Sequence, residues 1–181
     1  SPNDDNGYDI SDYQDIMDEF GSLPDWEELL AEMHRRGIRL LMDLVVNHSS
    51  DEHPWFIESC KSKDNPYPGY YIWAEEPPDE PAYTPIFPDV EDSVWTRDEK
   101  AGAYYFHRFY HFQPSLNHAN PRVREEVKKI MGFWLQLGVD GFRVDAASHL
   151  IEPKIGQPIG DPHAILKEYH DFASRPRGNV G

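Results

Sequence analysis

Two stretches of the chain repeat the same order of polar and apolar positions. In the first, residues 22–36, Ser22 and Asp25 form a helix-capping signature. Apolar side chains follow at helical spacing, at positions Trp26, Leu29, Leu30 and Met33. Gly37 ends this segment, and residues 38–46 (IRLLMDLVV) form a nearly continuous apolar run. Such a run predicts a strand covered on both faces in a parallel sheet.

The second stretch has the same order further along the chain. Asn120 is the predicted cap and Pro121 the first helical residue, and Gly138 ends the segment. The apolar stripe between them consists of Val123, Val127, Ile130, Met131 and Trp134. Residues 139–146 (VDGFRVDA) then predict a second strand. A further helix is predicted over residues 161–173, starting with Asp161 and Pro162.

Alternating helices and strands predict an α/β fold with a parallel sheet, in which functional groups lie at the carboxyl ends of the strands. In the second strand, Phe142 and Val144 face one way while Arg143 and Asp145 face the other. Burying such a pair costs several kcal/mol unless its geometry is good. A structural ion pair and a catalytic site are the two interpretations of this face.

The residues between the two strands have a different character. Residues 51–118 hold most of the aromatic residues and more than half of the prolines, and residues 74–83 (AEEPPDEPAY) predict an exposed turn or loop. Loops between strand and helix are usually about 2 to 6 residues long. The segment therefore predicts an inserted small domain, with most aromatic side chains in its own core and one or two lining a cleft. This divides the chain into residues 1–50, 51–118 and 119–181.

Composition limits the partners. The net charge of −16 disfavours nucleic acid and membrane surfaces, whereas a neutral ligand such as a sugar is unaffected. Cys60 is the only cysteine, so no internal disulfide forms, and no apolar run approaches the roughly 18 residues of a membrane helix. A cytoplasmic location is favoured. Because Ser1 is not an initiator methionine, we expect the chain to be cut from something longer.

Four motifs together resemble glycoside hydrolase family 13, the α-amylase superfamily: DDNGYDISDY (4–13), DLVVNH (43–48), QPSLN (113–117) and GFRVDA (141–146). The similarity is greatest to the branch of oligo-1,6-glucosidases, α-glucosidases, sucrose isomerases and trehalose synthases. This resemblance implies part of a (β/α)8 TIM barrel, with a small domain inserted after the third strand. It also implies cleavage or transfer of α-glucosidic bonds with retention, on an oligosaccharide or disaccharide substrate.

The resemblance assigns roles to five residues. Asp145 matches the nucleophile, and Arg143 would keep it ionised and oriented, since a nearby guanidinium favours an ionised carboxyl group. His48 would donate a hydrogen bond to the glucose at the non-reducing end of the substrate. Asp5 would bind the same glucose, and Tyr8 would stack beneath it. A turn carboxylate and a packed tyrosine are the alternative interpretations of these last two residues.

Four further residues belong to these motifs. By resemblance, Asp43 and Asn47 are architectural groups that bind loop backbone, and Gln113 is structural near the site. Ser115 stands where the nearest relatives have aspartate, which puts any role of that aspartate in shaping the insertion in doubt. No cofactor is expected and no metal-ligand pattern is present. Some members of the family bind calcium near the residue that matches Asn47, but the residues of this chain give no support for such a site.

The general acid glutamate of the family is expected outside these residues. Glu152 follows Asp145 by seven positions, but its surroundings do not match the acid, so it is interpreted as a loop residue. The 181-residue polypeptide alone is expected to be inactive and to need the remainder of its own barrel as a partner. An α-glucosidase, a trehalose synthase or related transglucosylase, and a catalytically dead sugar- or partner-binding homologue remain as alternatives.

Overall fold

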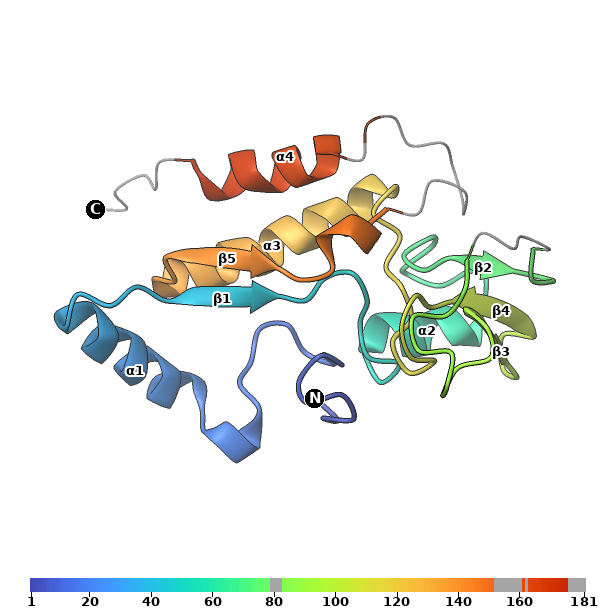
Figure 1. Ribbon diagram of the computed structural model, residues 1–181, viewed down its shortest axis with the longest axis horizontal. Helices are drawn as coiled ribbons and strands as arrows, with labels where there is room; N and C mark the ends of the chain where they lie inside the picture. The colour runs from blue at the N-terminus through green and yellow to red at the C-terminus, as the bar shows by residue number, and fades with distance from the viewer. Residues whose placement is uncertain (79–82, 152–160, 162, 176–181) are drawn as a thin grey trace.

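The computed structural model describes residues 1–78, 83–151, 161 and 163–175. Figure 1 shows a pair of parallel strands with helices beside it, and a separate small antiparallel sheet with its own helix. Within the described ranges, no helix is both long and apolar enough to cross a bilayer.

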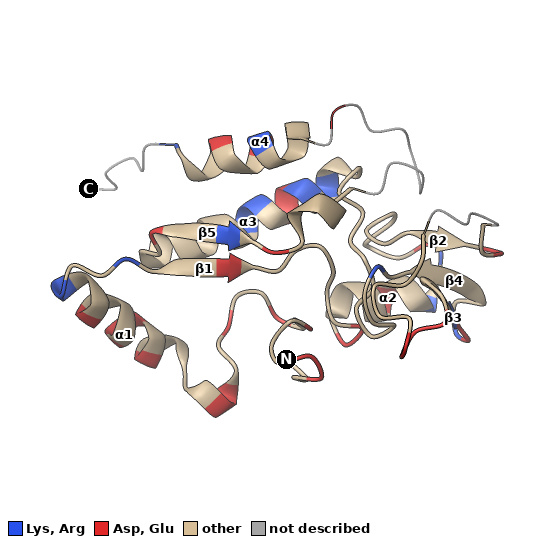
Figure 2. Cartoon of the chain, in the orientation of Figure 1, with Lys and Arg blue, Asp and Glu red and all other residues tan. Residues whose placement is uncertain are grey.

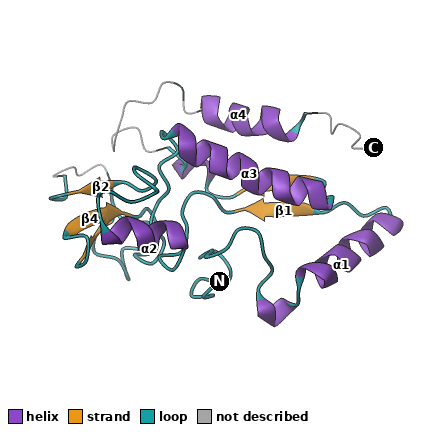
Figure 3. Cartoon of the chain, turned by 180° about the vertical axis from the view of Figure 1, so that it is seen from behind, coloured by secondary structure: helices purple, strands orange, loops and turns teal. Residues whose placement is uncertain are grey.

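The two predicted strands form a parallel pair. β1 (Leu41–Leu44) and β5 (Gly141–Val144) lie in register, with Asp43 opposite Arg143. The alternate side chains Met42, Leu44, Phe142 and Val144 face the core under α3 (Pro121–Leu137). Figure 3 shows α3 across this face of the strands. The pairing therefore leaves Asp43 and Arg143 side by side on the opposite face.

The helix boundaries follow the predicted caps. In α1 (Leu23–Arg35), the Ser22 backbone N–H donates to Asp25 at 2.8 Å, which completes a capping box. The Asn120 side chain accepts from the Arg122 N–H at the start of α3, and Gly138 ends that helix at φ +106°. All five predicted stripe residues of α3 are buried: Val123, Val127, Ile130, Met131 and Trp134.

The last described helix is α4 (His163–Ala173), and it packs beside α3. Asp161 accepts from the His163 N–H at 2.9 Å, as predicted for a cap. Pro162 and Glu152 lie outside the described residues.

Residues 51–118, called the inserted segment below, have their own sheet and core. The inserted segment contains α2 (Pro54–Lys61) and the strands β2 (Trp73–Ala74), β3 (Trp95–Asp98) and β4 (Ala103–Phe106), arranged in the order β2-β4-β3. The aromatic residues pack largely against one another, as expected, in a cluster that includes Phe56, Tyr70, Tyr71 and Tyr105. Two 3-10 turns, Asp18–Phe20 and Ala147–His149, complete the described elements.

The prediction that residues 38–46 form a strand covered on both faces is wrong. β1 contains only four residues, and its Leu41 is 65% exposed. Leu29 and Ile38, which the pattern placed in the apolar set, are 55% and 49% exposed. The reason is that β1 pairs only with β5 among the described strands, and helices cover one face of that pair (Figures 1 and 3).

These exposed side chains lead to a prediction for the 181-residue polypeptide expressed by itself. Apolar surface next to unpaired strand edges promotes self-association. We expect the polypeptide to bind 8-anilinonaphthalene-1-sulfonate strongly and to elute as oligomers in size-exclusion chromatography. A monomer that melts cooperatively without binding the dye would contradict this expectation.

Candidate functional site

Asp43, Arg143 and Asp145 meet at the carboxyl ends of β1 and β5. Arg143 Nη1 lies 2.7 Å and 2.9 Å from the two Asp43 carboxylate oxygens and 3.1 Å from Asp145 Oδ1. Figure 2 shows this meeting of acidic and basic segments at the ends of the two strands. The hydrogen bond that Arg143 donates to Asp43 is the main cause of the raised pKa of Arg143, and the negative charge of Asp43 is the next cause. Arg143 therefore bridges two carboxylates.

This arrangement corrects the interpretation of a buried pair between Arg143 and Asp145. The shortest contacts of Arg143 are to Asp43, and its side chain is 61% exposed, while the Asp145 side chain is 20% exposed. The sequence missed Asp43 as a partner because parallel register across two strands, and not spacing along one strand, brings it opposite Arg143.

Tyr8 joins the same network from the N-terminal segment. Its hydroxyl donates to Asp43 Oδ2 at 2.8 Å. This hydrogen bond is the largest cause of the raised pKa of Tyr8, and the negative charge of Asp43 adds to it. Asp43 was predicted to bind loop backbone, and its observed partners, the Tyr8 hydroxyl and the Arg143 guanidinium, are side chains instead.

A compact turn presents Asp5 and Tyr8. The fully buried carboxylate of Asp9 accepts the backbone N–H groups of Asp4 at 2.8 Å and Asp5 at 3.2 Å. The Tyr8 N–H donates to the Asp5 carbonyl at 2.9 Å, and Gly7 adopts a φ of +96° within the turn. The sequence motifs did not single out Asp9, although aspartate side chains in turns commonly accept hydrogen bonds from nearby backbone N–H groups.

His48 is 3% exposed, and both of its ring nitrogens have partners. Nε2 lies 2.7 Å from the Tyr8 carbonyl oxygen, and Nδ1 lies 3.1 Å from Asn47 Nδ2. A carbonyl only accepts, so the proton sits on Nε2 and Nδ1 accepts from the amide. Burial is the main cause of the lowered pKa of His48, which favours this neutral form.

These contacts change two predicted roles. The Nε2 proton of His48 is already donated to Tyr8, so a bond from His48 to a bound glucose would have to share that proton. Asn47 was predicted to bind loop backbone with its side chain, and that side chain contacts the His48 ring instead. The backbone carbonyl of Asn47 accepts from the Leu116 N–H at 2.9 Å.

The inserted segment is joined to the site along residues 113–116. The Ser49 N–H donates to the Pro114 carbonyl, and His48 and Ser115 form an antiparallel bridge. The Ser115 hydroxyl accepts from the Arg108 N–H at 3.1 Å, so it supplies one of the hydrogen bonds that an aspartate would accept there. This strand-like contact fixes the insertion against the end of β1.

An aromatic side chain of the insertion also reaches the site. The Phe109 ring lies 5.5 Å from the His48 ring and 5.7 Å from the His149 ring, between centroids. Phe87 lies 6.3 Å from Phe109 and is 38% exposed. The sequence predicted one or two aromatic residues at a cleft without naming them, since their positions depend on how the insertion packs.

The surroundings of Asn47 bear on whether a calcium ion could bind there. Calcium takes six to eight oxygen ligands. The buried Asn47 Oδ1 has no hydrogen-bond partner in the described part of the chain, and no three His, Cys, Asp or Glu side chains there are grouped to hold a metal ion.

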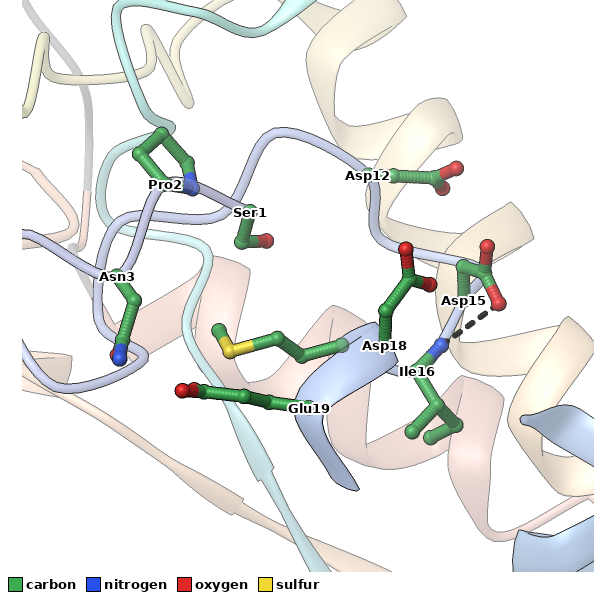
Figure 4. A pocket seen from close by; sticks show the side chains of 9 residues that line it. Ser1, Pro2, Asn3, Asp12, Asp15, Ile16, Asp18 and Glu19 are labelled. Atoms are coloured by element: carbon green, nitrogen blue, oxygen red, sulfur yellow. Dashed lines mark hydrogen bonds between the residues drawn. The ribbon is translucent and has the colours of Figure 1, made fainter. Parts of the chain in front are cut away.

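A separate cavity of about 560 Å³ lies along the N-terminal segment, where carboxylates line it (Figure 4). Asp15 there accepts the Ile16 N–H at 2.8 Å. Clustered carboxylates alone do not define a site.

Similarity to known proteins shows which family this chain belongs to. The model of the alpha-amylase catalytic domain matches residues 1–177. The chain belongs to the alpha-amylase family. Among similar members, the oligo-1,6-glucosidase of Parageobacillus thermoglucosidasius is 56% identical over 92% of this chain, and the trehalose synthase of Pimelobacter sp. is 42% identical over 95% of it. The solved trehalose-6-phosphate hydrolase of Bacillus licheniformis superposes over 95% of this chain with a TM-score of 0.85 at 38% identity.

Coverage of these alpha-amylase relatives is partial. The chain spans 29% of the oligo-1,6-glucosidase, 30% of the trehalose synthase and 33% of the trehalose-6-phosphate hydrolase. Family membership and the structural neighbours imply a TIM-barrel fold. In that fold, catalytic groups lie at the carboxyl ends of the strands, which is where β1 and β5 place Asp43, Arg143 and Asp145.

Proposed function

We propose that this chain carries the nucleophile of a retaining enzyme that acts on α-glucosides such as malto- or isomalto-oligosaccharides. The observation that supports the proposal most directly is the position of Asp145, directly after β5 and within hydrogen-bond distance of Arg143. A carboxylate held there beside a guanidinium is suited to attack an anomeric carbon.

The reaction has two balanced steps. An Asp145 oxygen forms a bond to the anomeric carbon as the glycosidic C–O bond breaks, and the leaving oxygen takes a proton from a carboxylic acid about 5 to 5.5 Å away. In the second step, water or a sugar hydroxyl attacks the same carbon and the bond to Asp145 breaks. The attacking group gives its proton to the general acid residue, which was left as a carboxylate by the first step. We assign the acid to residues outside this chain, as the family motif implies.

The neighbouring residues orient the reacting groups in this proposal. Arg143 holds Asp145, and Asp43 holds both Arg143 and the Tyr8 phenol. Asp5 and Tyr8 bind the glucose unit, and His48 supports them through the Tyr8 carbonyl. Preorganised contacts of this kind lower the barrier by fixing the geometry before reaction.

The domain assignment is part of the same proposal. Residues 1–50 and 119–181 supply barrel segments, and residues 51–118 form the small domain inserted after the third barrel strand. The separate sheet β2-β4-β3 and its aromatic core support this division. The remaining barrel strands come from other parts of the full-length enzyme.

Glucosyl transfer is the second candidate, because a trehalose synthase is among the relatives. The two candidates differ in what attacks the glucosyl-Asp145 intermediate. Incubation of the full-length enzyme with maltose separates them: hydrolysis releases only glucose, and isomerisation yields the non-reducing disaccharide trehalose. If neither product forms from maltose or isomaltose while either sugar binds, a catalytically dead homologue is indicated and the proposal fails.

A further inference from the structure

Gln113 connects the inserted segment to the turn that carries Asp5 and Tyr8. Its side-chain Nε2 donates to Asp5 Oδ2 at 2.7 Å and to the Tyr8 carbonyl at 3.0 Å. Its Oε1 accepts from the Tyr110 N–H at 3.2 Å. The residue is 1% exposed, so these contacts form away from solvent.

The surroundings determine the orientation of this amide. An amide nitrogen carries two hydrogens, and here both are donated, one to a carboxylate and one to a carbonyl. A flipped amide would place Oε1 against two acceptors, Asp5 and the Tyr8 carbonyl, and the NH₂ group against the Tyr110 N–H. Only the observed orientation satisfies all three partners, which are two backbone groups and the Asp5 side chain.

The contacts of Gln113 continue into the rest of the site. The Tyr8 carbonyl that Gln113 contacts also accepts from His48, and the Tyr8 hydroxyl donates to Asp43. The Gln113 hydrogen bond holds Oδ2 of Asp5, and a carboxylate has further lone pairs with which to accept from a ligand. One amide thus sets the position of both groups that bind glucose in the proposed function.

We propose that Gln113 is a positioning residue, through which the inserted segment sets the geometry of the Asp5–Tyr8 turn for the glucose unit. This inference rests on the proposed function. It predicts that the main consequence of losing the amide is weaker substrate binding, with Asp145 chemistry less affected.

The sharpest test is Gln113→Glu in the full-length enzyme, with steady-state kinetics on maltose or isomaltose from pH 5 to 8. The new carboxylate faces that of Asp5 and cannot donate, so at pH 7.5 we expect kcat/KM to fall roughly 30-fold, mainly through KM, the size expected when a buried charged hydrogen bond is lost. Two close carboxyl groups share a proton as the pH falls. The ratio of variant to wild-type kcat/KM should therefore rise near pH 5 but stay below 1, because a carboxylic acid has one O–H and cannot also donate to the Tyr8 carbonyl.

Two variants separate this role from a general loss of structure. Gln113→Met removes both donors without adding charge, so KM should rise by a similar factor with no recovery in acid. Gln136→Glu makes the same chemical change at an exposed position of α3 and should behave as wild type. Circular dichroism and thermal melting of each variant check the fold.

The outcomes also separate this inference from the proposed function. If Asp145→Asn is inactive while Gln113→Glu follows wild type at every pH, only the positioning role is overturned. The positioning role is also overturned if Gln113→Met and Gln113→Glu lose activity equally at every pH. If Asp145→Asn retains activity, the proposed function itself fails.

Discussion

Replacement of Asp145 by asparagine is expected to reduce kcat of the full-length enzyme on the order of 10⁴-fold or more, in line with the loss of other catalytic nucleophiles. The amide has nearly the shape of the carboxylate but lacks its charge and nucleophilicity, so no covalent glucosyl intermediate forms. The Asp145 side chain is partly exposed and lies outside the main core, so substrate binding and the melting temperature should change little. Kinetics on maltose or isomaltose, isothermal titration with the same sugar and thermal melting measure the three quantities.

A matched control is Asp64→Asn, which makes the same change at an exposed position of the inserted segment. That variant should keep wild-type kinetics. Near wild-type turnover by Asp145→Asn would show that another residue is the nucleophile. A large drop in melting temperature would instead point to the structural ion pair as the role of this carboxylate.

Asp43→Asn is expected to have the second largest effect, a fall in kcat/KM of about 10²-fold. Asp43 orients the Tyr8 phenol and the Arg143 guanidinium together, and displacement of reacting or binding groups by about 1 Å can reduce the rate by that factor. The hydrogen bond and charge of Asp43 raise the pKa of Tyr8, so the variant should also titrate Tyr8 at lower pH. Ultraviolet titration of wild type, Asp43→Asn and a Tyr8→Phe reference checks this second readout.

Asp171→Asn is the appropriate comparison, since it also removes a carboxylate from an ion pair, with Lys167 on the exposed face of α4. Exposed pairs of this kind contribute about 0 to 1 kcal/mol, so no kinetic change is expected. If Asp43→Asn kept both kcat/KM and the Tyr8 titration of wild type, the hydrogen bonds of Asp43 would not position the site.

The sequence by itself determined the local elements and part of the site. Cap residues and 3.6-residue periodicity act within a few positions, which is why α1, α3 and their ends at Gly37 and Gly138 were predictable. Alternation along β5 likewise placed Arg143 and Asp145 on one face, because the direction of successive side chains in a strand is a local property.

The tertiary structure alone decided how the site is connected. Tyr8 and Asp43 are 35 positions apart and Gln113 and Asp5 are 108 apart, so no local pattern indicates that they meet. The exposure of Leu41 was likewise unpredictable, because an apolar run indicates the burial it requires but not which elements provide it. Hydrogen bonds between distant segments depend on strand register and on how the insertion packs, and both are fixed only when the whole chain folds.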